Sequence, residues 1–188
     1  TDHINKIHMS FALPHNNQGV LYLLENNFAA AKSEFKLAIQ LDHSLTISHI
    51  NLAIVYLLEK KYDNSLKQLE AANQLNPKLD LIYQIKGLIY QELDHNESAF
   101  HYLNQAVQYN TTNYCAFINL GDLYFKTNQL KYAFLAWEKA MASPLYFYLL
   151  QRRLIYLNTT SIKLKEWISP MPLNDYQFLI PFTVLKEE

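Results

Sequence analysis

The chain has 188 residues, of which half are hydrophobic, so an ordered core is expected and an intrinsically disordered chain is excluded. Sixteen basic side chains against seventeen acidic ones leave a formal charge of −1, without the basic stripe that neutralises nucleic-acid phosphates. A single cysteine, Cys115, excludes a secreted domain stapled by internal disulfides.

Residues 1–11 carry no repeated pattern, and we expect them to be the remnant of a preceding helix or a short cap. The sequence contains no signal peptide and no apolar stretch of the roughly 18–20 residues that a membrane-spanning helix needs. A cytoplasmic location is therefore favoured. A removed leader or anchor stays open, because the chain begins at Thr1 without an initiator methionine.

From residue 12 onwards, one pattern recurs every 34 residues in four copies. The repeated positions are a small residue (Gly19, Ala53, Gly87, Gly121), then a tyrosine (Tyr22, Tyr56, Tyr90, Tyr124), a second small residue (Ala31, Ser65, Ala99, Ala133) and an alanine (Ala38, Ala72, Ala106, Ala140). A fixed period of this length indicates a stack of like units, each burying its apolar face against the next. We assign the four repeats to residues 12–45, 46–79, 80–113 and 114–147.

The second copy defines the unit. Residues 47–59 are apolar around most of a helical circumference, which predicts a helix packed on both sides. A polar break at 60–63 precedes a second predicted helix from about residue 64 to 75, and Asn76-Pro77 closes the unit. Where the two helices cross, we expect the small residue of the first helix, such as Ala53, to face the small residue of the second.

After the fourth copy the pattern stops. Residues 148–168 form a predicted capping helix region, because Gln151, Arg152 and Arg153 give its helix one polar side. Residues 169–188 are an apolar tail interrupted by prolines. We expect this tail to be buried against the repeats, in their groove or against another chain.

The repeated positions resemble the tetratricopeptide repeat family, whose signature runs from a bulky residue through Leu-Gly, Tyr, Ala, an aromatic residue, Ala and Pro. The fourth copy matches this signature as Phe117, Leu120-Gly121, Tyr124, Ala133, Trp137, Ala140 and Pro144. The third copy departs from it with Lys86 in place of Leu and Thr111 in place of Pro. The resemblance covers about 136 of the 188 residues. It implies an all-α, right-handed superhelical solenoid of helix–turn–helix repeats with a C-terminal capping helix.

In that family the first helix of each repeat lines a concave face on which peptides bind. By this resemblance the predicted groove set, a name kept below, comprises Asn16, Val20, Ile47, Ile50, Asn51, Ile54, Leu81, Gln84, Leu88, Ile118, Asn119 and Asp122. These positions suit an apolar peptide or helix, with amides available for its backbone. Ordinary packing between repeats is the alternative use of the same apolar positions.

One subclass of the family holds the acidic C-termini of chaperones through lysine and arginine. Asn16, Leu81 and Ile85 occupy those positions here, so we exclude that partner. The seven histidines include no i, i+4 pair beside an acidic residue, and Cys115 has no histidine close by in sequence. We therefore expect no catalytic residues, no cofactor, no metal and no enzymatic activity.

Our hypothesis is a non-catalytic interaction scaffold or chaperone-like adaptor, whose partner is a protein or peptide with an apolar segment. Nucleic acid and a membrane span are not expected. A first alternative is a self-assembling homo-oligomer, in which the tail 169–188 fills its own groove or that of a neighbour. A second alternative, implied by the resemblance, is an interaction module of a larger secretion, pilus or envelope-assembly protein or of an enzyme.

Overall fold

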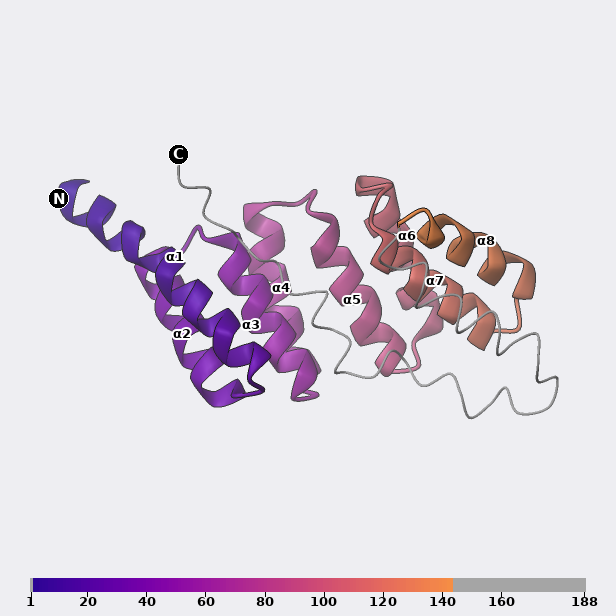
Figure 1. Ribbon diagram of the computed structural model, residues 1–188, viewed down its shortest axis with the longest axis horizontal. Helices are drawn as coiled ribbons and strands as arrows, with labels where there is room; N and C mark the ends of the chain where they lie inside the picture. The colour runs from indigo at the N-terminus through magenta and orange to yellow at the C-terminus, as the bar shows by residue number, and fades with distance from the viewer. Residues whose placement is uncertain (1, 144–188) are drawn as a thin grey trace. The chain divides into compact units, whose positions relative to one another are not determined.

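The computed structural model describes residues 2–143, so the predicted capping helix region 148–168 and the tail 169–188 lie outside the described residues. Over the described range the chain forms eight helices joined by short turns (Figure 1). They fall into two compact units, one ending at Lys78 and the other beginning at Leu79. The predicted all-α fold of paired helices is confirmed. The right-handed superhelix and the repeat boundaries stay predictions.

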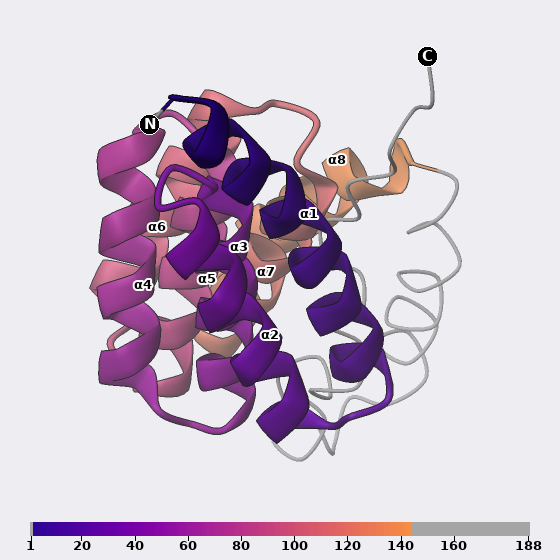
Figure 2. The same ribbon diagram turned by 90° about the vertical axis from the view of Figure 1, so that its left-hand side faces the viewer.

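The first unit contains two helical hairpins. Helix α1 (Asp2–Leu24) packs on α2 (Phe28–Leu41), and α3 (Thr46–Leu58) packs on α4 (Tyr62–Leu75), while α2 contacts α3 (Figures 1 and 2). Residues 2–11 are the beginning of α1, which continues through Pro14. Because proline has no N–H, one helical hydrogen bond is missing at Pro14. Helix α4 begins at Tyr62, earlier than the predicted start near residue 64.

The second unit repeats this arrangement with α5 (Asp80–Glu92) on α6 (Asn96–Tyr109) and α7 (Tyr114–Lys126) on α8 (Leu130–Met141), and α6 contacts α7. Asn113 caps α7, because its Oδ1 accepts from the N–H of Ala116 at 2.9 Å. The Nδ2 of Asn113 donates to Oδ2 of Asp80 at 2.7 Å, and that of Asn110 donates to the same oxygen at 3.0 Å. Asp80, at the start of α5, thereby holds the turn that precedes α7.

The turn inside each hairpin has one geometry in all four copies. It contains a residue in the left-handed region with φ of 58–60°, and these residues are again spaced by 34: Asn26, Lys60, Asp94 and Asn128. The N–H of the following residue donates to the carbonyl of the repeated tyrosine, for example Lys61 to Tyr56 at 2.8 Å and Gln129 to Tyr124 at 2.8 Å. This bond closes the end of the first helix as in a Schellman turn.

The small residues of the repeat sit where the helices leave no room. Ala31, Ser65, Ala99 and Ala133 are fully buried. In the second copy the two small residues face each other as expected, since Oγ of Ser65 donates to the carbonyl of Ala53 at 2.7 Å. Each glycine also lies under the large residue that follows it by sixteen positions. A Cβ built on Gly19 would stand 2.6 Å from the ring of Phe35, and one on Gly87 would stand 2.6 Å from Cγ of Leu103. At Gly121 the obstructing side chain is Trp137.

Lys86, where the family signature has leucine, is buried in the second unit. Its Nζ lies 5.7 Å from the ring centroid of Tyr102 and 6.0 Å from that of Tyr83. The aliphatic stem fills the space of a leucine while the ammonium group lies over aromatic faces. A lysine therefore fits this position without interrupting the packing.

Candidate functional site

Most of the predicted groove set is buried. Ten of its twelve members are buried and two, Ile47 and Leu81, are half-buried. In the first unit Ile50 and Ile54 have 0% and 1% of their surface exposed, and in the second Ile118 has 1%. Their burial means that a partner can reach these side chains only if their surroundings move.

The polar members in the first unit form a small hydrogen-bonded group between α1 and α3. Oδ1 of Asn16 accepts from Oγ of Ser48 at 3.0 Å and from Nδ2 of Asn51 at 3.0 Å. Oδ1 of Asn51 is buried without a hydrogen-bond partner among the described residues. Ser48 was not in the predicted groove set. Its position three residues before Asn51, on the same face of α3, is the sequence signal that points to it.

In the second unit, α5 presents one polar–apolar–polar face. Gln84, Leu88 and Gln91 follow each other at i, i+4 and i+7, and all three are buried. Within the described part of the chain, Nε2 of Gln84 and Oε1 of Gln91 have no hydrogen-bond partner. On this buried face, one amide donor and one amide acceptor, on either side of an apolar side chain, therefore have no partner among the described residues.

On α7, the members of the predicted groove set are Ile118, Asn119 and Asp122, the last being the only charged residue of the set. Nε1 of Trp137 donates to Oδ1 of Asp122 at 3.0 Å. The indole ring lies 5.7 Å from the ring of Phe125, measured between centroids. Asp122 thus holds Trp137 of α8 in place, and this contact is structural.

The ion pairs with shifted pKa values lie outside the predicted groove set. In the first unit Glu59 pairs with Lys32 at 2.5 Å and with Lys61 at 3.0 Å. Burial acts to raise the pKa of Glu59, but hydrogen bonds and charge from the two lysines outweigh it and hold that pKa below its usual value. In the second unit Lys126, bonded to Asp94, lowers the pKa of that exposed carboxyl group.

Apart from Asp122, the predicted groove set consists of uncharged side chains. Between residues 2 and 143, no group of three or more His, Cys, Asp or Glu side chains is arranged to hold a metal ion. None of the helices described is long and apolar enough to cross a membrane. The predicted groove set therefore combines mostly buried apolar side chains with buried amide groups.

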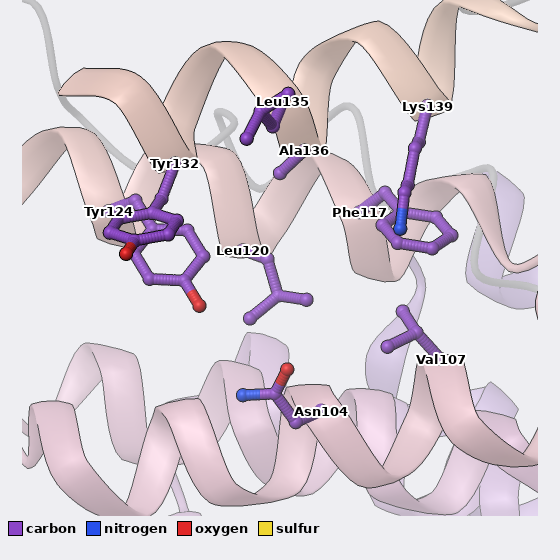
Figure 3. A pocket seen from close by; sticks show the side chains of 9 residues that line it. All are labelled: Asn104, Val107, Phe117, Leu120, Tyr124, Tyr132, Leu135, Ala136 and Lys139. Carbon is purple, nitrogen blue, oxygen red and sulfur yellow. The ribbon is translucent and has the colours of Figure 1, made fainter. Parts of the chain in front are cut away.

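A second surface lies between α6, α7 and α8 and was not predicted. It contains a cavity of about 230 Å³, lined mainly by apolar and aromatic side chains (Figure 3). A sequence signal exists in the comparison of α8 with α6. Leu130, Tyr132 and Leu135 stand where α6, 34 residues earlier, has Asn96, Ser98 and His101.

Comparisons with known proteins agree with the fold. The tetratricopeptide repeat family model matches residues 14–44 and 81–113, and no curated protein matches the chain. The structure of MamA from Desulfovibrio magneticus RS-1 is similar at 21% identity and a TM-score of 0.59, over 70% of this chain and 74% of that one. PilF of Pseudomonas aeruginosa is similar at 22% identity and a TM-score of 0.60, over 75% of this chain and 61% of that one.

A third similar structure is YrrB, described as a tetratricopeptide repeat protein with an unusual peptide-binding site. It has 19% identity and a TM-score of 0.56, over 88% of this chain and 90% of that chain. Two family matches, the 34-residue period and eight helices in hairpin pairs agree with one another. The tetratricopeptide repeat family is therefore the one that the chain resembles, with family matches over residues 14–44 and 81–113, and repeats of this family generally serve in protein–protein interaction.

Proposed function

We propose that the chain is a non-catalytic scaffold or chaperone-like adaptor that binds an apolar peptide or helix through the predicted groove set. Tetratricopeptide repeat domains are typically non-catalytic and bind proteins or peptides. The observation that carries the proposal is the pair of unused hydrogen-bonding groups on α5, Nε2 of Gln84 and Oε1 of Gln91.

An unsatisfied buried amide group costs about 1–3 kcal/mol, so a ligand that supplies its partner gains that amount on binding. The two glutamines are seven residues apart, which is about 10.5 Å along a helix. An extended peptide offers free backbone N–H and C=O groups over this distance. Leu88 lies between the glutamines and supplies apolar contact worth roughly 25 cal/mol per Å² of buried area.

Burial of the predicted groove set adds a condition to the proposal. Ile54, Gln84 and Leu88 have at most 3% of their surface exposed, so the binding-competent state is one in which these faces open. The apparent affinity for a peptide is then reduced by the fraction of molecules that are open. Variants that favour opening are expected to bind more tightly without any new contact.

The proposal is tested with a displayed library of twelve-residue peptides, selected on the full chain and then measured by fluorescence anisotropy. Gln84→Leu and Gln91→Leu are each expected to weaken a selected peptide about fivefold, since each removes one hydrogen bond of roughly 1 kcal/mol. Gln108→Leu, on the exposed side of α6, is the matched control and should bind as the parent does. Equal affinity in all four proteins would refute the role of the α5 amides.

A second candidate function rests on the apolar sequence of the tail 169–188, which favours burial against the repeats or against another chain. The tail 169–188 would fill the predicted groove set of its own chain or of a neighbouring copy, acting as a lid or an assembly arm. Light scattering on the full chain and on a 1–168 truncation separates these cases. A dimer that becomes a monomer indicates an assembly arm, whereas a monomeric truncation with higher peptide affinity than a monomeric full chain indicates a lid.

A further inference from the structure

Helix α8 carries an exposed apolar surface that the described residues of the second unit leave uncovered. Leu130, Tyr132, Phe134 and Leu135 have 47–52% of their surface exposed. They are four of the ten large exposed hydrophobic side chains of the described residues, yet α8 contributes only twelve residues. Such clustering, with aromatic residues prominent, is typical of protein interaction surfaces.

The cavity noted above runs along this surface. Tyr124 and Tyr132 stand together at one end, Lys139 lies over Phe117 at the other, and Leu120 lies between the two ends (Figure 3). From Tyr132 to Lys139 the cavity follows seven residues of α8, or about 10.5 Å. Its volume of about 230 Å³ is below the roughly 300–1,000 Å³ of small-molecule sites. The size therefore suits side chains of a protein partner better than a whole small ligand.

The wall of the cavity also carries one positively charged side chain, Lys139. The Nζ of Lys139 lies 5.1 Å from the ring centroid of Phe117, and Lys139 forms no ion pair with any described residue. No carboxylate lines the cavity, and the neighbouring Glu138, although exposed, is not part of its wall. A carboxylate on the partner is the group that complements this end.

The polar groups of the wall favour a helical partner over an extended one. Nδ2 of Asn104 already donates to the carbonyl of Phe100 at 2.8 Å. Besides Asn104 and Lys139, only the hydroxyls of Tyr124 and Tyr132 are polar groups among the lining side chains. An extended backbone buried here would leave N–H and C=O groups without partners, whereas a helix satisfies its own.

This surface is separate from the predicted groove set. On α7 the residues that line the cavity are Phe117, Leu120 and Tyr124. The residues of α7 in the predicted groove set are Ile118, Asn119 and Asp122. At 3.6 residues per turn these two groups point to opposite sides of α7. A partner can therefore bind at the cavity without any opening of the predicted groove set.

We propose that the cavity between α6, α7 and α8 docks an amphipathic helix of a partner protein. Two apolar side chains of that helix, at i and i+3 or i+4, enter the cavity beside Leu120 and Leu135. An acidic residue at the end of the same apolar stripe pairs with Lys139. Leu130 and Phe134 extend the contact along the outer side of α8.

The test uses a hydrocarbon-stapled fourteen-residue helix with leucines at i, i+3, i+4 and i+7 and one glutamate beside the last leucine. Anisotropy at low salt measures its binding to the full chain. Lys139→Glu is expected to weaken binding about fivefold, and a lysine-for-glutamate version of the helix should recover the loss in that variant. Leu135→Ala should weaken both helices. Lys131→Glu, on α8 but outside the cavity wall, is the control and should bind as the parent does.

Three results would overturn the proposal. One is the absence of binding by the stapled helix up to 1 mM, and another is an equal loss in Lys139→Glu and Lys131→Glu. The third is tighter binding by a synthetic peptide of residues 148–157, which contains no acidic residue. That result would assign the surface to the chain's own next segment. Circular dichroism of each variant confirms that it is folded, and these side chains are exposed enough for substitution.

Discussion

Substitution of Gly121 by alanine tests how the helices of the last hairpin fit together. A Cβ at this position would collide with Cδ1 and Nε1 of Trp137, a side chain with only 3% of its surface exposed. The rigid indole would have to move, and the move would strain its hydrogen bond to Asp122. Alanine is nevertheless the better helix former by about 1 kcal/mol, so propensity and packing act in opposite directions.

The balance favours destabilisation. Overpacking of a tight core costs about 1–3 kcal/mol, and loss of the Trp137 hydrogen bond adds about 1 kcal/mol. After the gain in propensity, a net loss of about 2 kcal/mol remains. For a chain of this length that loss lowers Tm by about 4–8 °C. Circular dichroism during thermal and urea unfolding provides the measurement.

Gly87→Ala is the matched control. The obstructing side chain there is Leu103, which is flexible, and the second copy already combines Ala53 with Leu69 sixteen positions later. The gain in helix propensity then offsets the repacking, and a change of less than about 1 kcal/mol is expected. If Gly121→Ala unfolds at the same temperature as the parent or higher, the packing argument for the glycine positions is wrong.

Three further predictions concern the turns, the charges and the buried amides. Lys60→Gly should raise the free energy of unfolding by about 0.5–1 kcal/mol, because lysine is strained in the left-handed region at φ 58°. Asn128→Gly should change it less, because asparagine tolerates that region. Equal gains in the two variants would contradict this explanation. Because the pKa of Glu59 is lowered by folding, its stabilisation is present above its unfolded pKa near 4.5 and is lost as pH falls through the folded value. Glu59→Gln should therefore unfold at a lower urea concentration than the parent at pH 7, and the two midpoints should converge below about pH 4.5. A difference in midpoint that does not change with pH would exclude a stabilising role for the Glu59 carboxylate. Asn16→Ala removes the acceptor shared by Ser48 and Asn51 and should cost about 2 kcal/mol in urea unfolding, whereas an unchanged midpoint would show that the group adds nothing.

The period of 34 residues is the part of the fold that the sequence predicts best. Every copy repeats the residue types that close packing requires, so Ala31 and Ala99 could be placed in the interior without a structure. The turn conformation was harder to predict. Asparagine and aspartate, present at Asn26 and Asp94, are residue types that often adopt the left-handed region. The second copy has Lys60 at the same position, and lysine does not indicate such a turn.

The candidate site was less predictable for a physical reason. A helix that is apolar on several sides, such as α3, does not indicate which side packs inside the unit and which side meets a partner. Ile50 and Ile54 belong to such a helix, and both are buried in the structure. The glycine contacts also depend on the lengths of side chains sixteen positions away, and spacing alone does not reveal them.

Methyl NMR of the full chain with a library-selected peptide tests whether partners bind through the predicted groove set. Ile54 in the first unit, and Leu88 and Ile118 in the second, report on that set. Leu130 and Leu135 report on the exposed surface of α8. Peptide addition is expected to shift the first three methyl groups and to leave the two on α8 unchanged. Shifts confined to Leu130 and Leu135 would contradict this expectation.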